Sequence, residues 1–365
     1  MDDIPPLEAD IRRRIAAAGP MPVAEFMALC LTDAEHGYYS TRDPFGERGD
    51  FVTSPEISQM FGELVGLWMA AVWKQMGAPP NLRVIELGPG RGTMMADALR
   101  AAKVMPAFRD ALVLHFVEIS PALQAAQEKT LEQLPVPLFW HAALKDVPPG
   151  PAIVVANEFF DALPVNQAVK TERGWHERLV EIDAVGNLAF ALAPRPLAQF
   201  ERLLPAAARS APEGSIFEWR SGTVAMELGR RLAAEGGAAL VIDYGHAQSA
   251  VGETLQAVGR HAYVDPLTAP GSIDLTAHVD FEALGKAVEA MGAAAYGPIE
   301  QAEFLRRLGI ETRAAALKTH AAKATAATID AALARLIGHG RTGMGTLFKA
   351  AAYAHAKLGT PPGFE

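Results

Sequence analysis

The stretch that decides the fold is Glu86-Leu87-Gly88-Pro89-Gly90-Arg91-Gly92-Thr93. It ends the short apolar run at residues 83–87 and leads into a helix-like segment at residues 92–102. Glycines at alternate positions let the backbone turn tightly and let a ligand approach it closely. The helix that begins here offers free N–H groups to an anionic group. This order of strand, glycine-rich turn and helix predicts a ligand site at the first strand of an α/β fold.

The alternation of strands and helices continues along the chain. Apolar runs at residues 112–118, 137–140, 152–156 and 238–243 predict further strands. After the run at residues 112–118, Ser120 is the expected N-cap of a helix, with Pro121 at its first position. Such alternation is typical of a parallel sheet that helices cover on both faces. We therefore expect a Rossmann-like α/β fold with a doubly wound, mostly parallel sheet.

The chain is longer than one compact core usually supports, since it has 365 residues. We expect an N-terminal helical cover at residues 1–77, an α/β core at 78–300 and a C-terminal helical region at 301–365. Roughly 80 residues separate the fourth and fifth predicted strands, which is far more than a crossover needs. The excess predicts an insertion at about residues 166–235, with a hairpin formed by residues 168–180 and 187–192. It should lie beside the carboxyl ends of the strands, where open sheets bind ligands.

Composition narrows the class of protein. The formal net charge is −9, and we expect no nucleic acid partner, because a surface that binds phosphates is usually basic. No apolar run is long enough to span a membrane, and the acidic N-terminus is unlike a signal or transit peptide. The single cysteine, Cys30, allows no disulfide within the chain. These features favour the cytoplasm of a bacterium, and they leave the oligomeric state open.

Two cofactors suit a glycine-rich turn of this kind. A dinucleotide site prefers Gly-x-Gly-x-x-Gly. In this chain Gly92 follows Gly90 by only two residues, and an acidic residue, Glu86, precedes the first glycine. The spacing resembles the Glu-x-Gly-x-Gly-x-Gly pattern of class I methyltransferases, which use S-adenosylmethionine and release S-adenosylhomocysteine. Glu118 ends the second strand, where its carboxylate can accept hydrogen bonds from a ribose diol. Both cofactors carry a ribose, so an NAD-dependent oxidoreductase stays an alternative.

A polar segment, Asn157-Glu158-Phe159-Phe160-Asp161-Ala162-Leu163-Pro164, follows the fourth strand. This position borders both cofactor and substrate in a doubly wound sheet. Asn157 could hold the cofactor or accept a hydrogen bond from a substrate nitrogen. Glu158 and Asp161 could bind a cationic group and take up a proton, so they are the candidate catalytic residues. The alternative is a turn into a helix with Asp161 as its N-cap.

The end of the fifth strand supplies candidate substrate-binding residues. Asp243, Tyr244 and His246 come where that strand meets the expected ligand edge of the sheet. His246 is a weaker candidate for a general base than the carboxylate of Glu158. We predict no metal, because methyl transfer needs none and the most suggestive group lacks a cysteine partner: Asp274, His278 and Asp280.

Longer strings carry a resemblance to one family. They are residues 49–58 (GDFVTSPEIS), 61–63 (FGE), 86–92, 157–164, 242–245 (IDYG), 252–256 (GETLQ), 274–281 (DLTAHVDF) and 343–349 (GMGTLFK). They run along most of the chain, and on them it resembles the MidA family of S-adenosylmethionine-dependent methyltransferases. The resemblance implies a class I methyltransferase core with N-terminal helices packed over the cofactor.

The resemblance also implies roles for single residues. Gly88, Gly90, Gly92 and Glu118 would hold the cofactor, and Thr53, Ser54, Pro55 and Glu56 would cover it. The expected cofactor-binding set further includes Glu86, Thr93 and Asn157. Asp50 joins Asp243, Tyr244 and His246 as an expected substrate-binding residue.

The mitochondrial members of this family methylate an arginine in a subunit of respiratory complex I. The resemblance therefore implies a protein arginine methyltransferase, whose partner is a complex I subunit or its bacterial counterpart. Glu158 and Asp161 would orient the substrate guanidinium, and Glu158 would accept its proton. Three alternatives remain: a non-catalytic assembly chaperone that binds the cofactor, a small-molecule methyltransferase and an NAD-dependent oxidoreductase.

Overall fold

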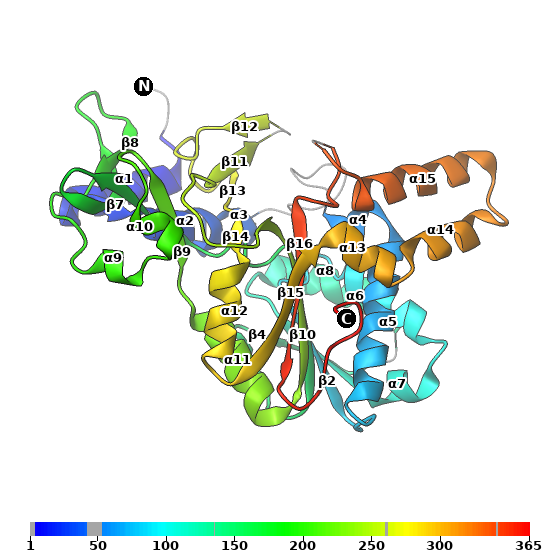
Figure 1. Cartoon of the computed structure of the whole chain (residues 1–365). Coiled ribbons are helices and arrows are strands. Elements are labelled where there is room, and N and C mark those ends of the chain that lie inside the picture. The colour runs from blue at the N-terminus through cyan, green and yellow to red at the C-terminus, as the bar shows by residue number, and fades with distance from the viewer. Residues whose placement is uncertain (1–3, 42–52, 135, 260–261, 341) are drawn as a thin grey trace.

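The computed structural model describes residues 4–41, 53–134, 136–259, 262–340 and 342–365 (Figure 1). Its centre is an eight-stranded sheet of order β15-β16-β10-β5-β2-β3-β4, with β14 paired to β10. The strands are β2 (Leu82–Leu87), β3 (Leu112–Val117), β4 (Leu138–His141), β5 (Ala152–Asn157), β10 (Gly237–His246), β14 (Val279–Asp280), β15 (Ala293–Glu300) and β16 (Phe348–His355). The pairs from β4 to β10 are parallel, and β16 is antiparallel to both of its neighbours. The doubly wound, mostly parallel sheet that the sequence predicts is confirmed.

Helices cover both faces of this sheet because its strands are apolar on both faces. On β2, Val84 packs into one hydrophobic cluster and Ile85 into the other. The first cluster contains α5 (Gln59–Gln75), α6 (Thr93–Ala102), α7 (Pro106–Ala111), α8 (Pro121–Leu131), α13 (Gln301–Arg307), α14 (Ile310–Lys318) and α15 (Lys323–Ile337). The second contains α11 (Thr223–Glu235), α12 (Phe281–Glu289) and the 3₁₀ turn η1 (Leu144–Asp146). The expected cap of α8 is confirmed, since the Ser120 hydroxyl accepts from the Leu123 amide.

The insertion forms a second, smaller sheet at one end of the molecule (Figure 1). Its strands are β6 (Val165–Thr171), β7 (Gly174–Ile182), β8 (Leu188–Leu192) and β9 (Ile216–Arg220), joined by β1 (Met21–Pro22) from the N-terminal region. Its helices are α9 (Phe200–Leu203) and α10 (Ala206–Arg209). The first helices, α1 (Pro6–Ala18) and α2 (Val23–Thr32), share a hydrophobic cluster with β6 and β7. The N-terminal region and the insertion therefore share one packed unit.

A third sheet and two short helices complete the part of the chain that the structure describes. The sheet has the order β12-β11-β13 and is built from β11 (Gln256–Gly259), β12 (Ala262–Val264) and β13 (Asp274–Thr276). The short helices are α3 (Tyr38–Thr41) and α4 (Ser54–Ile57). The third sheet and α3 lie between the small sheet and the central sheet (Figure 1), whereas α4 lies against α5, α6 and α15. No helix among the described residues is long and apolar enough to cross a membrane.

Three details of secondary structure differ from the sequence analysis. Residues 301–365 are not wholly helical, because β16 lies among them and β15 precedes them. The run at residues 168–180 is not one strand, because Thr171 and Gly174 close a turn between β6 and β7. The segment after β5 does not become a helix capped by Asp161; β6 follows it directly at Val165. Alanine-rich β16 has the composition of a helix, and its position between two strands overrides that local preference.

Candidate active site

The glycine-rich turn after β2 has the conformation that glycine alone adopts easily. Gly88, Gly90 and Gly92 have φ angles of 61°, 55° and 81°. The turn is anchored to the neighbouring strand, since the Gly88 amide donates to the Val117 carbonyl at 3.1 Å. A Cβ on Gly88 would lie 2.9 Å from the ring of Phe159. Helix α6 starts directly after this turn, at Thr93.

Two buried acceptor atoms beside this turn lack hydrogen-bond partners. They are Oε2 of Glu86 and Oδ1 of Asn157. Both residues line a small hollow of about 40 Å³ next to the glycine turn. Burial raises the pKa of Glu86 to about 8. Unpaired buried acceptors cost free energy, so this hollow suits a cationic donor such as the ammonium group of the expected cofactor.

Glu118 lies at the end of β3 and is tied to the glycine turn through one glutamine. Its Oε1 accepts from the Ser120 amide at 2.8 Å, and its Oε2 accepts from Gln127 Nε2 at 3.2 Å. Gln127 Nε2 also donates to the Gly90 carbonyl at 2.8 Å. Burial raises the pKa of Glu118, and these two donors oppose that rise. The carboxylate therefore stands at a fixed distance from the turn, as a diol-binding residue must.

The main cavity runs from Glu118 to the segment after β5 and has a volume of about 360 Å³. At the Glu118 end its walls are mostly apolar: Val117, Ile119, Leu123, Ala142, Ala143 and Leu144. Such a slot beside a diol acceptor fits a flat nucleobase. Together with the hollow at Glu86, these residues fit S-adenosylmethionine in size and in chemistry.

The segment at residues 53–56 covers the junction of the cavity and the hollow. Thr53 lines both spaces, and Pro55 and Glu56 line the hollow. The Ser54 amide donates to Glu158 Oε1 at 3.0 Å. The Thr93 hydroxyl donates to Glu56 Oε1 at 2.7 Å. The cover is therefore bonded to α6 on one side and to a candidate catalytic residue on the other.

Glu158 is held in an unusual backbone conformation. Its φ is 50°, in the left-handed region that residues other than glycine rarely adopt. Its amide is fixed by the Ile242 carbonyl at 2.9 Å, and its Oε1 also accepts from Asn157 Nδ2 at 3.2 Å. Strain of this kind is concentrated at functional sites. Burial raises the pKa of Glu158 to about 7, so the group can change protonation near neutral pH.

Asp161 and Tyr244 supply two more buried polar atoms at the other end of the cavity, beside Glu158. Both residues line the cavity; neither Asp161 Oδ1 nor the Tyr244 hydroxyl makes a hydrogen bond of good geometry, although the two groups lie close enough to act on each other. Asp161 is 5% exposed and Tyr244 is 8% exposed. Burial raises the pKa of Asp161, and the Tyr244 hydroxyl and the Arg220 guanidinium oppose that rise. A ligand with several N–H donors would satisfy both atoms.

Asp243 has a structural position that the sequence analysis did not expect. Its Oδ2 accepts from the amides of Phe160 and Asp161 at 3.0 and 3.2 Å, and its Oδ1 accepts from the Tyr244 amide at 2.9 Å. The side chain is fully buried and does not line the cavity. Asp243 therefore fixes the backbone that carries Asp161 and Tyr244, and it does not face a substrate.

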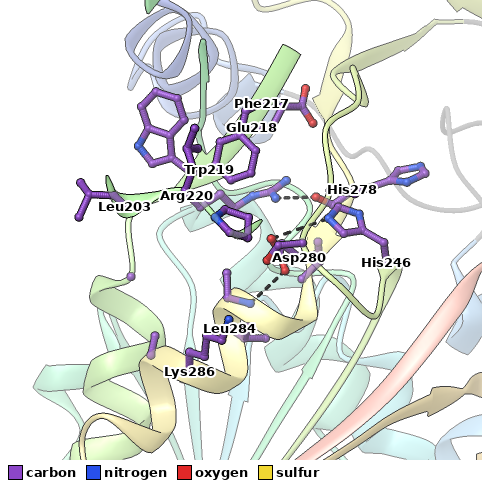
Figure 2. A pocket seen from close by; sticks show the side chains of 18 of the residues that line it. Leu203, Phe217, Glu218, Trp219, Arg220, His246, His278, Asp280, Leu284 and Lys286 are labelled. Atoms are coloured by element: carbon purple, nitrogen blue, oxygen red, sulfur yellow. Dashed lines mark hydrogen bonds and ion pairs between the residues drawn. The ribbon is translucent and has the colours of Figure 1, made fainter. Parts of the chain in front are cut away.

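His246 faces a different and larger cavity of about 840 Å³, on the other side of the segment after β5 (Figure 2). Its Nε2 lies 3.9 Å from Asp280 Oδ2. Phe160 and Leu163 line this cavity, and Leu163 also lines the smaller one. The two cavities are thus neighbours, and His246 is not grouped with Glu158. The remaining predicted substrate residue, Asp50, lies outside the described residues.

Several residues that the fold brings to the site are not predicted from the sequence. Tyr39, Asp274 and Thr276 line the cavity at its polar end. The Tyr39 hydroxyl donates to Asp274 Oδ1 at 3.1 Å. Asp274 had a sequence signal, but as part of a metal site. In the described part of the chain no group of three or more His, Cys, Asp or Glu residues could hold a metal.

Comparison with known proteins agrees with this geometry. Residues 64–299 match a family described as S-adenosyl-L-methionine-dependent methyltransferases. The chain is 40% identical over 345 residues to the mitochondrial protein arginine methyltransferase NDUFAF7 homolog of Drosophila melanogaster, covering 86% of this chain and 77% of that protein. It is 38% identical to the Homo sapiens protein arginine methyltransferase NDUFAF7, covering 85% and 75% of the two chains.

A solved structure is similar over almost the whole chain. It is a COG1565 superfamily member from Burkholderia thailandensis, bound to S-adenosyl-homocysteine. The identity is 32%, the TM-score is 0.82, and the match covers 98% of this chain and 92% of the other.

Proposed function

Because the chain belongs to the S-adenosyl-L-methionine-dependent methyltransferases, in the family that includes the NDUFAF7 protein arginine methyltransferases, we propose that it methylates an arginine side chain of a protein. The observation that carries this proposal is the polar end of the cavity. There Asp161 Oδ1 and the Tyr244 hydroxyl are buried side by side, without a hydrogen bond of good geometry, near the carboxylate of Glu158. A guanidinium is a planar cation with five N–H donors and no acceptor. It can therefore donate hydrogen bonds to the oxygen atoms of these groups.

The proposed roles follow from the protonation of the two carboxyl groups. S-adenosylmethionine supplies an electrophilic methyl group when it is bound. Asp161 binds and orients the guanidinium, and its charge keeps the reacting nitrogen in place. Glu158 accepts the proton that this nitrogen loses, because its pKa of about 7 suits a general base at neutral pH. Asn157, Glu86, Glu118 and the glycine turn hold the cofactor in this proposal, under the cover of residues 53–56.

Three rival functions are less well supported. A dinucleotide oxidoreductase needs the third glycine of its motif one residue later than Gly92. A non-catalytic chaperone gives no reason for a strained Glu158 near two buried polar groups that lack well-formed hydrogen bonds. A small-molecule methyltransferase fits the cavity, but the similar curated proteins are named as protein arginine methyltransferases.

We further propose that the substrate is a subunit of respiratory complex I or of its bacterial counterpart, and that the reaction takes place in the bacterial cytoplasm.

A labelling experiment tests the proposed function. The purified protein is incubated with S-adenosylmethionine carrying a deuterated methyl group and with an extract of cells from which its gene has been deleted. We expect deuteromethyl-arginine in tryptic peptides of very few proteins, found by tandem mass spectrometry. Heat-treated enzyme is the control for background methylation by the extract. Labelling of lysine or of small molecules alone would overturn the assignment to arginine and leave the methyltransferase family intact.

The buried carboxyl group of Glu86 gives a pH dependence for cofactor binding. Its pKa of about 8 means that it is mostly protonated at pH 7 in the free protein. A bound ammonium group favours the ionised carboxylate, so binding should release a proton and strengthen as pH rises. We expect affinity for S-adenosylhomocysteine to increase between about pH 6 and 7.5, by up to about tenfold per unit. Calorimetric titration measures this, and Glu86→Gln should flatten the dependence. An equally steep dependence in that variant would assign it to another group.

A further inference from the structure

Arg220, at the end of β9 in the insertion, bonds to two segments of the chain, one after β5 and one after β13. Its Nε donates to the Leu163 carbonyl at 3.0 Å, and its Nη2 donates to the Asp161 carbonyl at 3.1 Å. Its other bonds go to the carbonyls of Ala277 at 2.6 Å and His278 at 2.7 Å. Figure 2 shows the side chain reaching from β9 towards His278. A single guanidinium thus binds the segment after β5 and the segment after β13.

Both segments carry parts of the proposed acceptor site. The first contains Asp161, and the second is bonded to it directly, since the Ala277 amide donates to the Asp161 carbonyl at 3.1 Å. The ring of His278 packs edge-on against the ring of Tyr244, with centroids 5.5 Å apart. Arg220 therefore acts on both Asp161 and Tyr244. It bonds directly to the carbonyl of Asp161, and it holds His278, which packs against the ring of Tyr244.

Arg220 also brings a positive charge into an acidic cluster. The charged and titratable groups near Asp161 come from four elements: Glu158, Asp243, Tyr244, Tyr39 and Arg220. Burial and neighbouring carboxylates raise the pKa values of Glu158 and Asp243, and burial raises that of Asp161. The Arg220 guanidinium lowers the pKa of Asp161 and Asp243 against these effects. It therefore favours an ionised Asp161.

We propose that Arg220 is the positioning residue of the methyl-acceptor site, which fixes Asp161 opposite Tyr244 and keeps Asp161 charged for a cationic substrate. This inference rests on the proposed function in one respect, because it takes Asp161 as the residue that binds the substrate guanidinium. Arginine suits the task because its planar fork bonds several acceptors at once, whereas lysine is a point charge on a flexible stem. The insertion thus contributes to the chemistry of the central domain through one side chain.

Two substitutions separate the two parts of this role. Arg220→Lys keeps the positive charge but loses the planar guanidinium group. Its kcat/KM should fall at least about tenfold, and the acid limb, which is the rise of kcat/KM with pH on the acidic side, should stay as in wild type. Arg220→Met loses both the charge and the planar group, so its kcat/KM should fall further and its acid limb should become steeper, because the raised pKa of Asp161 makes that group titrate there together with Glu158. S-adenosylhomocysteine affinity, measured by calorimetry at pH 8, should stay within about threefold of wild type in both variants. Addition of methylguanidinium to Arg220→Ala should restore part of the rate, and methylammonium should restore less.

The control is Arg230→Met, which removes a half-exposed arginine that pairs with Glu227 on α11. It should leave the rate and the pH profile unchanged. A merely structural Arg220 would lower the melting temperature and the rate but leave the acid limb in place, and methylguanidinium would not act; that result overturns the proposal. The assays use whichever acceptor the wild-type protein methylates. If this acceptor proves not to be arginine, the proposed function fails, while the steepness of the acid limb still tests the link between Arg220 and Asp161.

Discussion

Replacing Glu158 by glutamine should lower kcat at least about a hundredfold, because general-base catalysis contributes roughly 10²–10⁴ to a rate. Glutamine has the same shape and keeps an acceptor for the Ser54 amide and for Asn157 Nδ2. The cover at residues 53–56 should therefore stay in place. We expect affinity for S-adenosylhomocysteine to change by less than about threefold, so that the loss lies in turnover.

The direction of the expected pH dependence of the rate follows from the raised pKa of Glu158. A base must be deprotonated to act, and the pKa of Glu158 is raised to about 7. Wild-type kcat/KM should therefore rise between about pH 6 and 8 and then level off, and the variant should lack this limb. The matched control is Glu177→Gln, because burial also raises the pKa of Glu177, which lies on β7 outside the cavity. Wild-type turnover by Glu158→Gln would exclude Glu158 as the base and leave Asp161 as the next candidate.

Replacing Gly90 by valine should weaken the binding of S-adenosylmethionine and S-adenosylhomocysteine at least about a hundredfold. Two effects combine. The backbone at Gly90 has φ of 55°, which is least accessible to a β-branched residue. Gly90 also lines both the cavity and the hollow, so a valine side chain would occupy space that the cofactor needs. Calorimetric titration at pH 8 measures the loss, and circular dichroism checks that the variant is folded.

Gly186→Val is the matched control for this experiment. Gly186 has φ of 92° in the turn between β7 and β8, and nothing lies within 4 Å of the Cβ that it would gain. This variant carries backbone strain of the same kind, far from the cavity, and should bind both ligands as wild type does. Tight binding by a folded Gly90→Val protein would contradict the cofactor site that we propose at the glycine turn.

The parallel part of the sheet could be predicted because its strands are short apolar runs with turns at both ends. Such runs are typical of strands buried on both faces, and β2, β3, β5 and β10 all have this character. β16 could not be predicted in the same way. Its sequence, FKAAAYAH, favours a helix locally, and only the gap between β10 and β15 makes it a strand.

The residues of the candidate site also fall into two groups, those that could be predicted from the sequence and those that could not. Residues that adjoin a strand end in the sequence, such as Glu118 and Glu158, could be proposed because sheet topology fixes where strand ends meet. Arg220 and Tyr39 could not, because the insertion and α3 reach the cavity only through tertiary packing. Asp243 shows a further limit, since sequence places it at the right edge but cannot tell an acceptor for backbone amides from an acceptor for substrate.

The position of β16 has a consequence for how the protein is made. β16 follows all other described strands in sequence, yet it is an interior strand of the central sheet, between β10 and β15. Until residues 348–355 leave the ribosome, β10 has an unpaired, apolar edge of the kind that templates aggregation. The nascent chain therefore cannot complete its central sheet before residue 355 has been synthesised. Messages truncated upstream of residue 348 should yield insoluble protein even though they encode every residue proposed here to bind the cofactor or to act in catalysis.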